Sequence, residues 1–141
     1  MRTLAKFGDS LVNFAFSIAL SLITNSPRGV KVPDKLLADI ARRMGLREYF
    51  HLHRLREGEL ADLVEALLAM AWVQGLIDLG TLSVSLTKGL SVHDRRSRME
   101  MEKVMADNLA ELVGKLMKEV KWEKCMEDFV FGLRKRLESS L

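Results

Sequence analysis

Two acidic residues, Asp62 and Glu65, stand three positions apart in an otherwise apolar stretch of the sequence. In a helix of 3.6 residues per turn such a pair projects within about 60° of the same face, so both carboxylates can approach one point. Mg²⁺ prefers oxygen ligands and is usually held by one or two carboxylates and water, which leaves room for a phosphate oxygen. The spacing therefore indicates a candidate site for Mg²⁺, with Mn²⁺ as an alternative. Pairs of this kind also occur on many helix faces that meet only solvent.

A third carboxylate, Asp9, follows Gly8 in a strongly apolar N-terminal segment. A carboxylate in apolar surroundings must be paired, protonated or bound to a metal, because an isolated buried charge is costly. We therefore expect Asp9 to belong with Asp62 and Glu65 rather than to stand alone in the core.

Charged residues alternate in sign along the middle of the chain. Residues 42–57 hold five basic residues against two acids, residues 58–87 hold four acids and no lysine or arginine, and residues 88–98 are basic again. Basic flanks suit the backbone of a polyanion, and acids without basic neighbours suit metal ions. The alternation fits a surface that cuts phosphodiesters, although charge runs alone are more often solvated faces. The candidate residues for binding such a polyanion are Arg42, Arg43, Arg54, Arg56, Arg95, Arg96 and Arg98.

The elements that must position these residues are helices. A chain of 141 residues has the size of one domain, and helical periodicity with only two prolines predicts a single all-α domain over residues 1–141, which excludes a two-domain enzyme. The first helix is apolar nearly all round, so we expect it to be the central helix, covered by the others. We expect helices over about 3–24, 33–45, 59–78, 95–121 and 123–139, a short helix running into a loop over 46–57, and a surface loop over 80–91.

Composition also narrows the class of protein. With 48% hydrophobic and 29% charged residues, the chain is too apolar to stay disordered. A single cysteine, Cys125, cannot form an intrachain disulfide, which favours a reducing, cytoplasmic compartment. The apolar run 11–23 is shorter than the roughly 20 residues that a bilayer requires and is interrupted by Asn13, so we expect a buried helix and no membrane association.

Two segments together resemble a known family. The segment from Thr3 to Ser10, Thr-Leu-Ala-Lys-Phe-Gly-Asp-Ser, and the later segment from Ala61 to Ala69, Ala-Asp-Leu-Val-Glu-Ala-Leu-Leu-Ala, are similar to the two catalytic motifs of the ribonuclease III endonuclease domain. The second motif matches along its whole length. The first matches in part, because the family's glutamate four residues before the aspartate is Ala5 here. The resemblance covers roughly residues 3–80.

The resemblance implies a ribonuclease III-like helical bundle that hydrolyses double-stranded RNA as a homodimer, by a metal-dependent mechanism. It assigns the catalytic and metal-binding roles to Asp9, Asp62 and Glu65, and it leaves the fourth carboxylate without a counterpart at Ala5. We expect no double-stranded-RNA-binding domain after the segment that resembles the family. The arginines above would then have to hold the substrate.

Two other functions remain open at this point. One is a catalytically inactive RNA-binding dimer of the same fold, for which Ala5 is the best argument. The other is an unrelated helical interaction module in which the carboxylates merely face solvent. A structure separates this last alternative from the others, because the resemblance requires the three carboxyl groups to lie close enough to share an ion.

Overall fold

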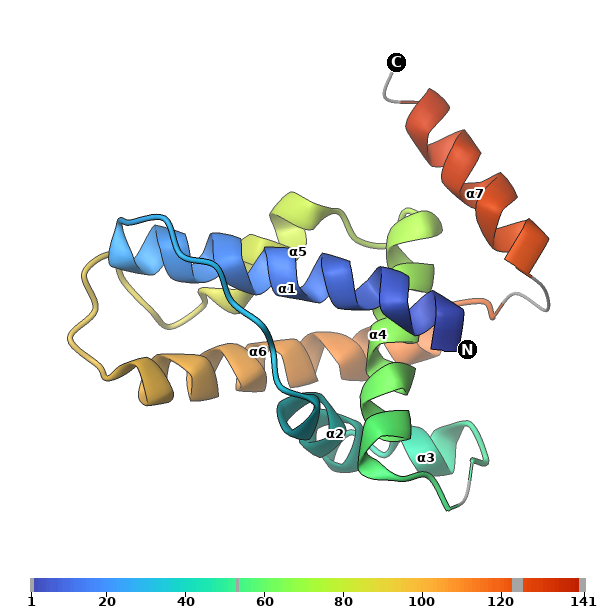
Figure 1. Cartoon of the computed structure of the whole chain (residues 1–141), viewed down its shortest axis with the longest axis horizontal. Coiled ribbons are helices and arrows are strands. Elements are labelled where there is room, and N and C mark those ends of the chain that lie inside the picture. Colours follow the sequence, from blue (N-terminus) through green and yellow to red (C-terminus); the bar gives the residue numbers. More distant parts are fainter. Residues whose placement is uncertain (1, 53, 123–125, 140–141) are drawn as a thin grey trace.

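The computed structural model describes residues 2–52, 54–122 and 126–139, so Cys125 lies outside the described residues. Every regular element within them is a helix, and the prediction of an all-α fold is confirmed (Figure 1). The helices are α1 (Arg2–Thr24), α2 (Asp34–Arg43), α3 (Leu46–Tyr49), α4 (Glu57–Val73), α5 (Leu79–Leu86), α6 (Arg98–Glu119) and α7 (Met126–Glu138).

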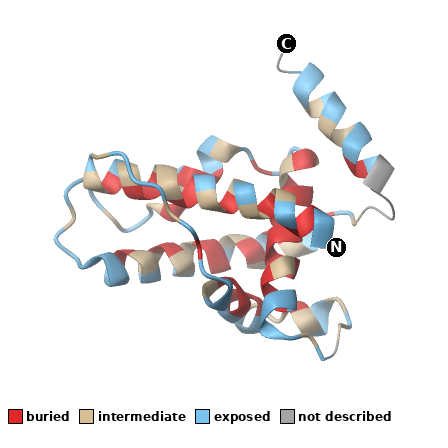
Figure 2. Ribbon diagram, in the orientation of Figure 1, coloured by how far each residue is buried: buried red, intermediate tan, exposed pale blue. Residues whose placement is uncertain are grey.

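Helix α4 is the centre of the packing. It contacts α1, α2, α6 and α7, and from Leu60 onward its side chains are buried on nearly every side (Figure 2). The prediction that the N-terminal helix is the central one is wrong. Helix α1 buries one face against α4 and α5, while Phe14 and Leu22 on its other side remain 58% and 50% exposed. An all-round apolar sequence does not distinguish a covered helix from one with a free apolar stripe.

Helix α4 ends earlier than its hydrophobic pattern predicts. Gly75 adopts a left-handed backbone conformation with φ of 75°, and the Leu76 amide donates back to the Ala71 carbonyl at 2.9 Å. This is the C-terminal arrangement that glycine favours, because it has no Cβ to clash at positive φ. The apolar residues beyond it belong to the connection to α5.

The expected surface loop over 80–91 is also wrong, because residues 80–86 belong to helix α5. Asp78 caps this helix by accepting a hydrogen bond from the Thr81 amide at 2.7 Å. Leu82 and Leu86 are fully buried, and the helix contacts α1 and α6. In this segment apolar residues (Leu82, Val84 and Leu86) alternate weakly with polar ones, and capping and tertiary packing favour the helix over this strand-like pattern.

The C-terminal helices differ in how they are covered. Helix α6 begins with a capping box between Ser97 and Glu100, three residues later than predicted. Helix α7 packs against the end of α4 where Gly132 adjoins Val73, its Phe129 ring contacts Phe7 of α1 edge-on, and the helix otherwise projects away from the bundle (Figure 1).

Helix α1 is long and apolar enough, by length and composition alone, to cross a membrane. A core helix passes the same test, and in this structure the inner face of α1 lies against α4 and α5. Asp9 and Asn13 belong to a row of polar residues on this helix. Asp9 bonds to Lys31, and Asn13 bonds to Asp9 and to the backbone of Val32.

Candidate active site

The two predicted motifs meet where α1 crosses α4. Gly8 on α1 is buried, and a Cβ atom built on it would stand 1.9 Å from the carbonyl oxygen of Glu65 and 2.5 Å from the carbonyl carbon. No side chain larger than hydrogen fits there without moving one of the helices. The backbone contact brings the next residue, Asp9, beside Glu65.

Asp9 is held by two donors. Its Oδ1 atom accepts a hydrogen bond from the Lys31 ammonium at 2.6 Å and another from the Asn13 side-chain amide at 3.2 Å. The Asp9 side chain is 33% exposed and that of Lys31 is 68% exposed, so this ion pair lies at the surface end of the site.

Lys31 reaches Asp9 because residues 28–32 run along α1 as a strap. Asn13 Oδ1 accepts from the Val32 amide at 2.8 Å, Ser17 Oγ accepts from the Val30 amide at 2.8 Å, and Ser21 Oγ accepts from the Arg28 amide at 2.8 Å. Polar residues at every fourth position of α1 therefore satisfy the backbone of a segment that has no secondary structure of its own. The sequence analysis missed this strap, although the four-residue spacing of Asp9, Asn13, Ser17 and Ser21 is visible in the sequence.

Glu65 is the most deeply buried acid in the part of the chain that the structure describes, with 4% of its surface exposed. Its Oε2 atom has no hydrogen-bond partner among the described residues. Burial, and then the hydrogen bond and charge of the neighbouring Asp9 carboxylate, raise the pKa of Glu65 to about 8. Glu65 is therefore protonated at neutral pH and donates to Asp9, as long as no cation is bound.

Asp9 shows the opposite shift. Burial acts to raise its pKa, but the hydrogen bond from Glu65 and the Lys31 ammonium outweigh burial and hold the pKa below its usual value. At neutral pH the pair thus consists of one ionised carboxylate, Asp9, and one neutral carboxylic acid, Glu65.

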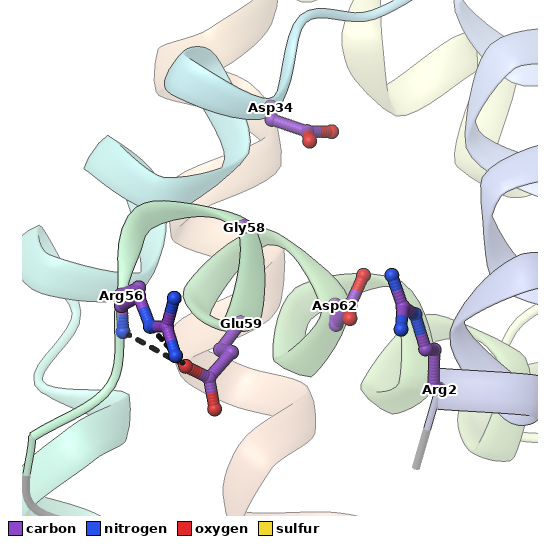
Figure 3. Close-up of a pocket in the computed structure, with 6 residues that line it drawn as sticks. All are labelled: Arg2, Asp34, Arg56, Gly58, Glu59 and Asp62. Atoms are coloured by element: carbon purple, nitrogen blue, oxygen red, sulfur yellow. Dashed lines mark hydrogen bonds and ion pairs between the residues drawn. The ribbon is translucent and has the colours of Figure 1, made fainter.

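Asp62 lies one turn before Glu65 and faces a neighbouring pocket of about 540 Å³ at the beginning of α4. In Figure 3 its carboxylate points toward the guanidinium of Arg2, while Arg56 and Glu59 form an ion pair on the other side of the pocket. Burial raises the pKa of Asp62; the Arg2 charge opposes this effect, and Asp34 adds to it. Sequence reasoning did not single out Arg2 or Asp34, because only the fold brings these distant residues to Asp62.

The fit to a divalent cation is close for two of the three predicted ligands. Asp9 and Glu65 adjoin and offer hard oxygen donors, and the orphaned Oε2 atom of Glu65 is a position that a cation would satisfy. Within the described residues, however, no three Asp, Glu, His or Cys side chains lie close enough together to hold one ion. The three carboxylates therefore do not converge on one point as expected. Asp9 and Glu65 form a close pair, and Asp62 lies in the adjoining pocket.

The seven candidate RNA-binding arginines do not gather at one place. Arg56 lines the pocket of Asp62, whereas Arg96 belongs to the connection between α5 and α6, where the His93 amide bonds to the Ile23 carbonyl at the far end of α1. Ile23 is 14 residues beyond Asp9, about 21 Å along a helix. Five of these arginines form ion pairs with a neighbouring acid: Arg42 with Asp39, Arg43 with Asp107, Arg56 with Glu59, Arg96 with Asp94 and Arg98 with Glu102. Arg54 and Arg95 are exposed loop residues.

A comparison with protein families matches the chain to a known family. The model of the family described as ribonuclease III matches residues 2–121, which covers both motifs and extends through α6. The match is longer than the roughly 3–80 that the two motifs alone suggest, and it leaves α7 outside. No curated protein matches the chain.

Proposed function

The chain belongs to the ribonuclease III family, and we propose that it is a divalent-cation-dependent endoribonuclease that cleaves double-stranded RNA. The observation that carries this proposal is the meeting of Asp9 and Glu65 at the Gly8 crossing. Two carboxyl groups from motifs 56 positions apart adjoin each other, and one of them has a buried oxygen atom for which the described residues provide no donor.

The protein's own residues have distinct tasks in this proposal. Lys31 and Asn13 hold Asp9 ionised and oriented at the surface end of the site. Glu65, which is buried, releases its proton when a cation takes the place of that proton. Asp62 adds negative charge in the adjoining pocket, and Arg2 and Arg56 of that pocket are placed to neutralise a phosphate of the substrate backbone.

Bound Mg²⁺ supplies Lewis acidity, which activates water and neutralises the charge that builds up on the phosphate. Attack of water in line with the scissile bond leaves a 5′ phosphate and a 3′ hydroxyl. Recognition of an A-form duplex rests on shape and backbone contacts, because side chains cannot read its deep and narrow major groove.

We further propose a homodimer formed through α1. Phe14, Ile18 and Leu22 follow one another at four-residue spacing on the side of α1 away from α4, and the outer two are half exposed. A row of large apolar side chains on a helix surface marks an interaction site when it is contiguous. In sedimentation at micromolar concentration we expect a dimer for the wild type and a monomer for Phe14→Glu. Val84→Glu, which changes a residue of similar exposure on α5, serves as the control and should remain dimeric.

A second candidate function is a binding protein of the same fold without catalysis. Ala5, which is 2% exposed one turn before Asp9, replaces the family's glutamate and leaves the site one carboxylate short. Such a protein would still hold duplex RNA through its arginines.

Cleavage and binding separate these two candidates. The full chain is incubated with long double-stranded RNA and Mg²⁺, beside Glu65→Gln, Asp62→Asn and a control variant, Glu111→Gln, which alters an exposed acid on α6. We expect cleavage by the wild type and the control, and none by the two site variants or in the presence of a chelator. Equal mobility shifts in a gel without cleavage by any of the proteins would favour the binding protein.

A further inference from the structure

Lys31 occupies a place next to the carboxylate pair where a cation would be expected. Its Nζ atom lies 2.6 Å from Asp9 Oδ1 in an ion pair. A positive charge therefore adjoins the carboxylate pair.

The fold holds the backbone on both sides of Lys31, whose side chain is 68% exposed. The amides on both sides of it, those of Val30 and Val32, are bonded to Ser17 and Asn13 of α1, and Val32 is 1% exposed. Because the backbone is fixed at both neighbours, the Lys31 side chain begins within reach of Asp9 whether or not a cation is present.

The charges at this place favour one divalent cation over two. When Glu65 is ionised, Asp9 and Glu65 carry two negative charges and Lys31 carries one positive charge. Ala5 adds nothing one turn before Asp9, and Arg2 faces the negative charge of Asp62. One divalent ion already exceeds the remaining negative charge of the pair, and a second would meet strong repulsion.

We propose that Lys31 is a positioning residue that supplies, as a tethered ammonium, the second positive charge of the site, so that each chain takes up a single divalent cation. This inference rests on the proposed function, since it concerns the cation used by the same carboxylates. It is carried by the position of Lys31, the orphaned Glu65 oxygen and the absence of an acid at Ala5.

Metal binding tests the proposal without reference to activity. The full chain is titrated with Mn²⁺ alone, and bound ions are counted by electron paramagnetic resonance and calorimetry. We expect one ion per chain for the wild type and, for Lys31→Met, an affinity higher by on the order of tenfold, because a positive charge no longer repels the ion at close range. Lys31→Arg keeps the charge and should resemble the wild type.

Lys35→Met is the matched control. Lys35 is an exposed lysine four residues further on, in the first turn of α2, and its substitution removes the same charge without touching Asp9. Its Mn²⁺ affinity should change less than threefold, since exposed charges at a distance are screened. Two ions per wild-type chain, no uptake by the wild type, or equal affinities for Lys31→Met and Lys35→Met would each overturn the proposal.

Cleavage rates at saturating Mg²⁺ give a second and independent readout. If Lys31 only competes with the cation, Lys31→Met should cleave as fast as the wild type once the metal is saturating. If its charge takes the place of a second cation in the site, as we propose, Lys31→Met should have a lower kcat although it binds Mn²⁺ more tightly. An unchanged or higher kcat would overturn this role while leaving the nuclease assignment intact. Conversely, absence of cleavage by every variant, together with tighter Mn²⁺ binding by Lys31→Met, would overturn the nuclease assignment and leave Lys31 as the counter-ion of the cation site.

Discussion

Gly8 of α1 lies so close to Glu65 of α4 that a Cβ atom on the glycine would stand 1.9 Å from the Glu65 carbonyl oxygen. The obstacle is backbone, which cannot rotate out of the way as a side chain can. The same contact that allows the two helices to cross therefore sets the separation of Asp9 and Glu65, and stability and the geometry of the site depend on one residue.

Replacing Gly8 by alanine should be strongly destabilising. We expect a loss of about 2–4 kcal/mol in the free energy of unfolding, because the helices must move apart and expose part of the core. Urea unfolding followed by circular dichroism measures this loss. Gly58→Ala is the control, since a Cβ there meets nothing within 4 Å in the first turn of α4, and it should leave stability unchanged or raise it by about 0.5–1 kcal/mol. Equal stabilities for the two variants would show that α1 and α4 do not cross as described.

Glu65→Gln should make the protein more stable at alkaline pH. The pKa of Glu65 is raised from an ordinary value of 4.5 to about 8 in the folded state, so the folded chain binds more protons than the unfolded chain between these values. The contribution of Glu65 to stability therefore falls as pH rises from about 4.5 to 8, and it is constant outside this window. Glutamine has a similar shape and no charge to bury.

The expected difference between Glu65→Gln and the wild type is near zero at pH 4 and about 1–3 kcal/mol in favour of the variant at pH 8, measured in the presence of a chelator. Comparing the two proteins at each pH cancels the contributions of the other titrating groups. A difference that is the same at both pH values would show that Glu65 is ionised in the folded protein at neutral pH.

The sequence predicts the fold class, and it places the ends of α1, α2, α6 and α7 to within about three residues, because periodic apolar spacing and strong punctuation are local signals. It carries α4 five residues too far, to 78 instead of Val73. It fails at α5, where a helix is formed by the Asp78 cap and by burial of Leu82 and Leu86 against α1 and α6. It also exchanges the roles of α1 and α4, since hydropathy does not say which apolar helix the others cover.

The candidate site is predicted in part for a similar reason. The motifs name Asp9, Asp62 and Glu65, but their separation depends on the crossing of two helices, and the structure pairs Asp9 with Glu65 while turning Asp62 toward Arg2. Lys31 belongs to neither motif, and it lies at the site only because the strap runs along α1. Long-range pairing of a loop with a helix leaves no periodic pattern in the loop, although it does leave one in the polar row on α1.

The strap makes Asn13 a structural residue. Its side-chain oxygen accepts from the buried Val32 amide and its nitrogen donates to Asp9. Asn13→Ala should lower the free energy of unfolding by about 1–3 kcal/mol, because the Val32 amide would lose its partner in a buried place. Ser21→Ala removes a bond at the exposed end of the same strap and should cost less than about 1 kcal/mol. Thermal unfolding of the two variants checks the order, and a larger loss for Ser21→Ala would contradict the description of the strap.

Uptake of a divalent cation should release protons from the site. Because the pKa of Glu65 is about 8 without a cation, most chains carry a proton on Glu65 at pH 7, and that proton must leave when the carboxylate binds the ion. Calorimetric titration with Mn²⁺ at pH 7 in buffers of different ionisation enthalpy should therefore show release of about one proton per ion bound, falling toward zero at pH 9.5. The apparent affinity should rise with pH up to about 8 and then level off. In Glu65→Gln the release should be absent at both pH values, and release of a full proton by this variant would place the titrating group elsewhere than on Glu65.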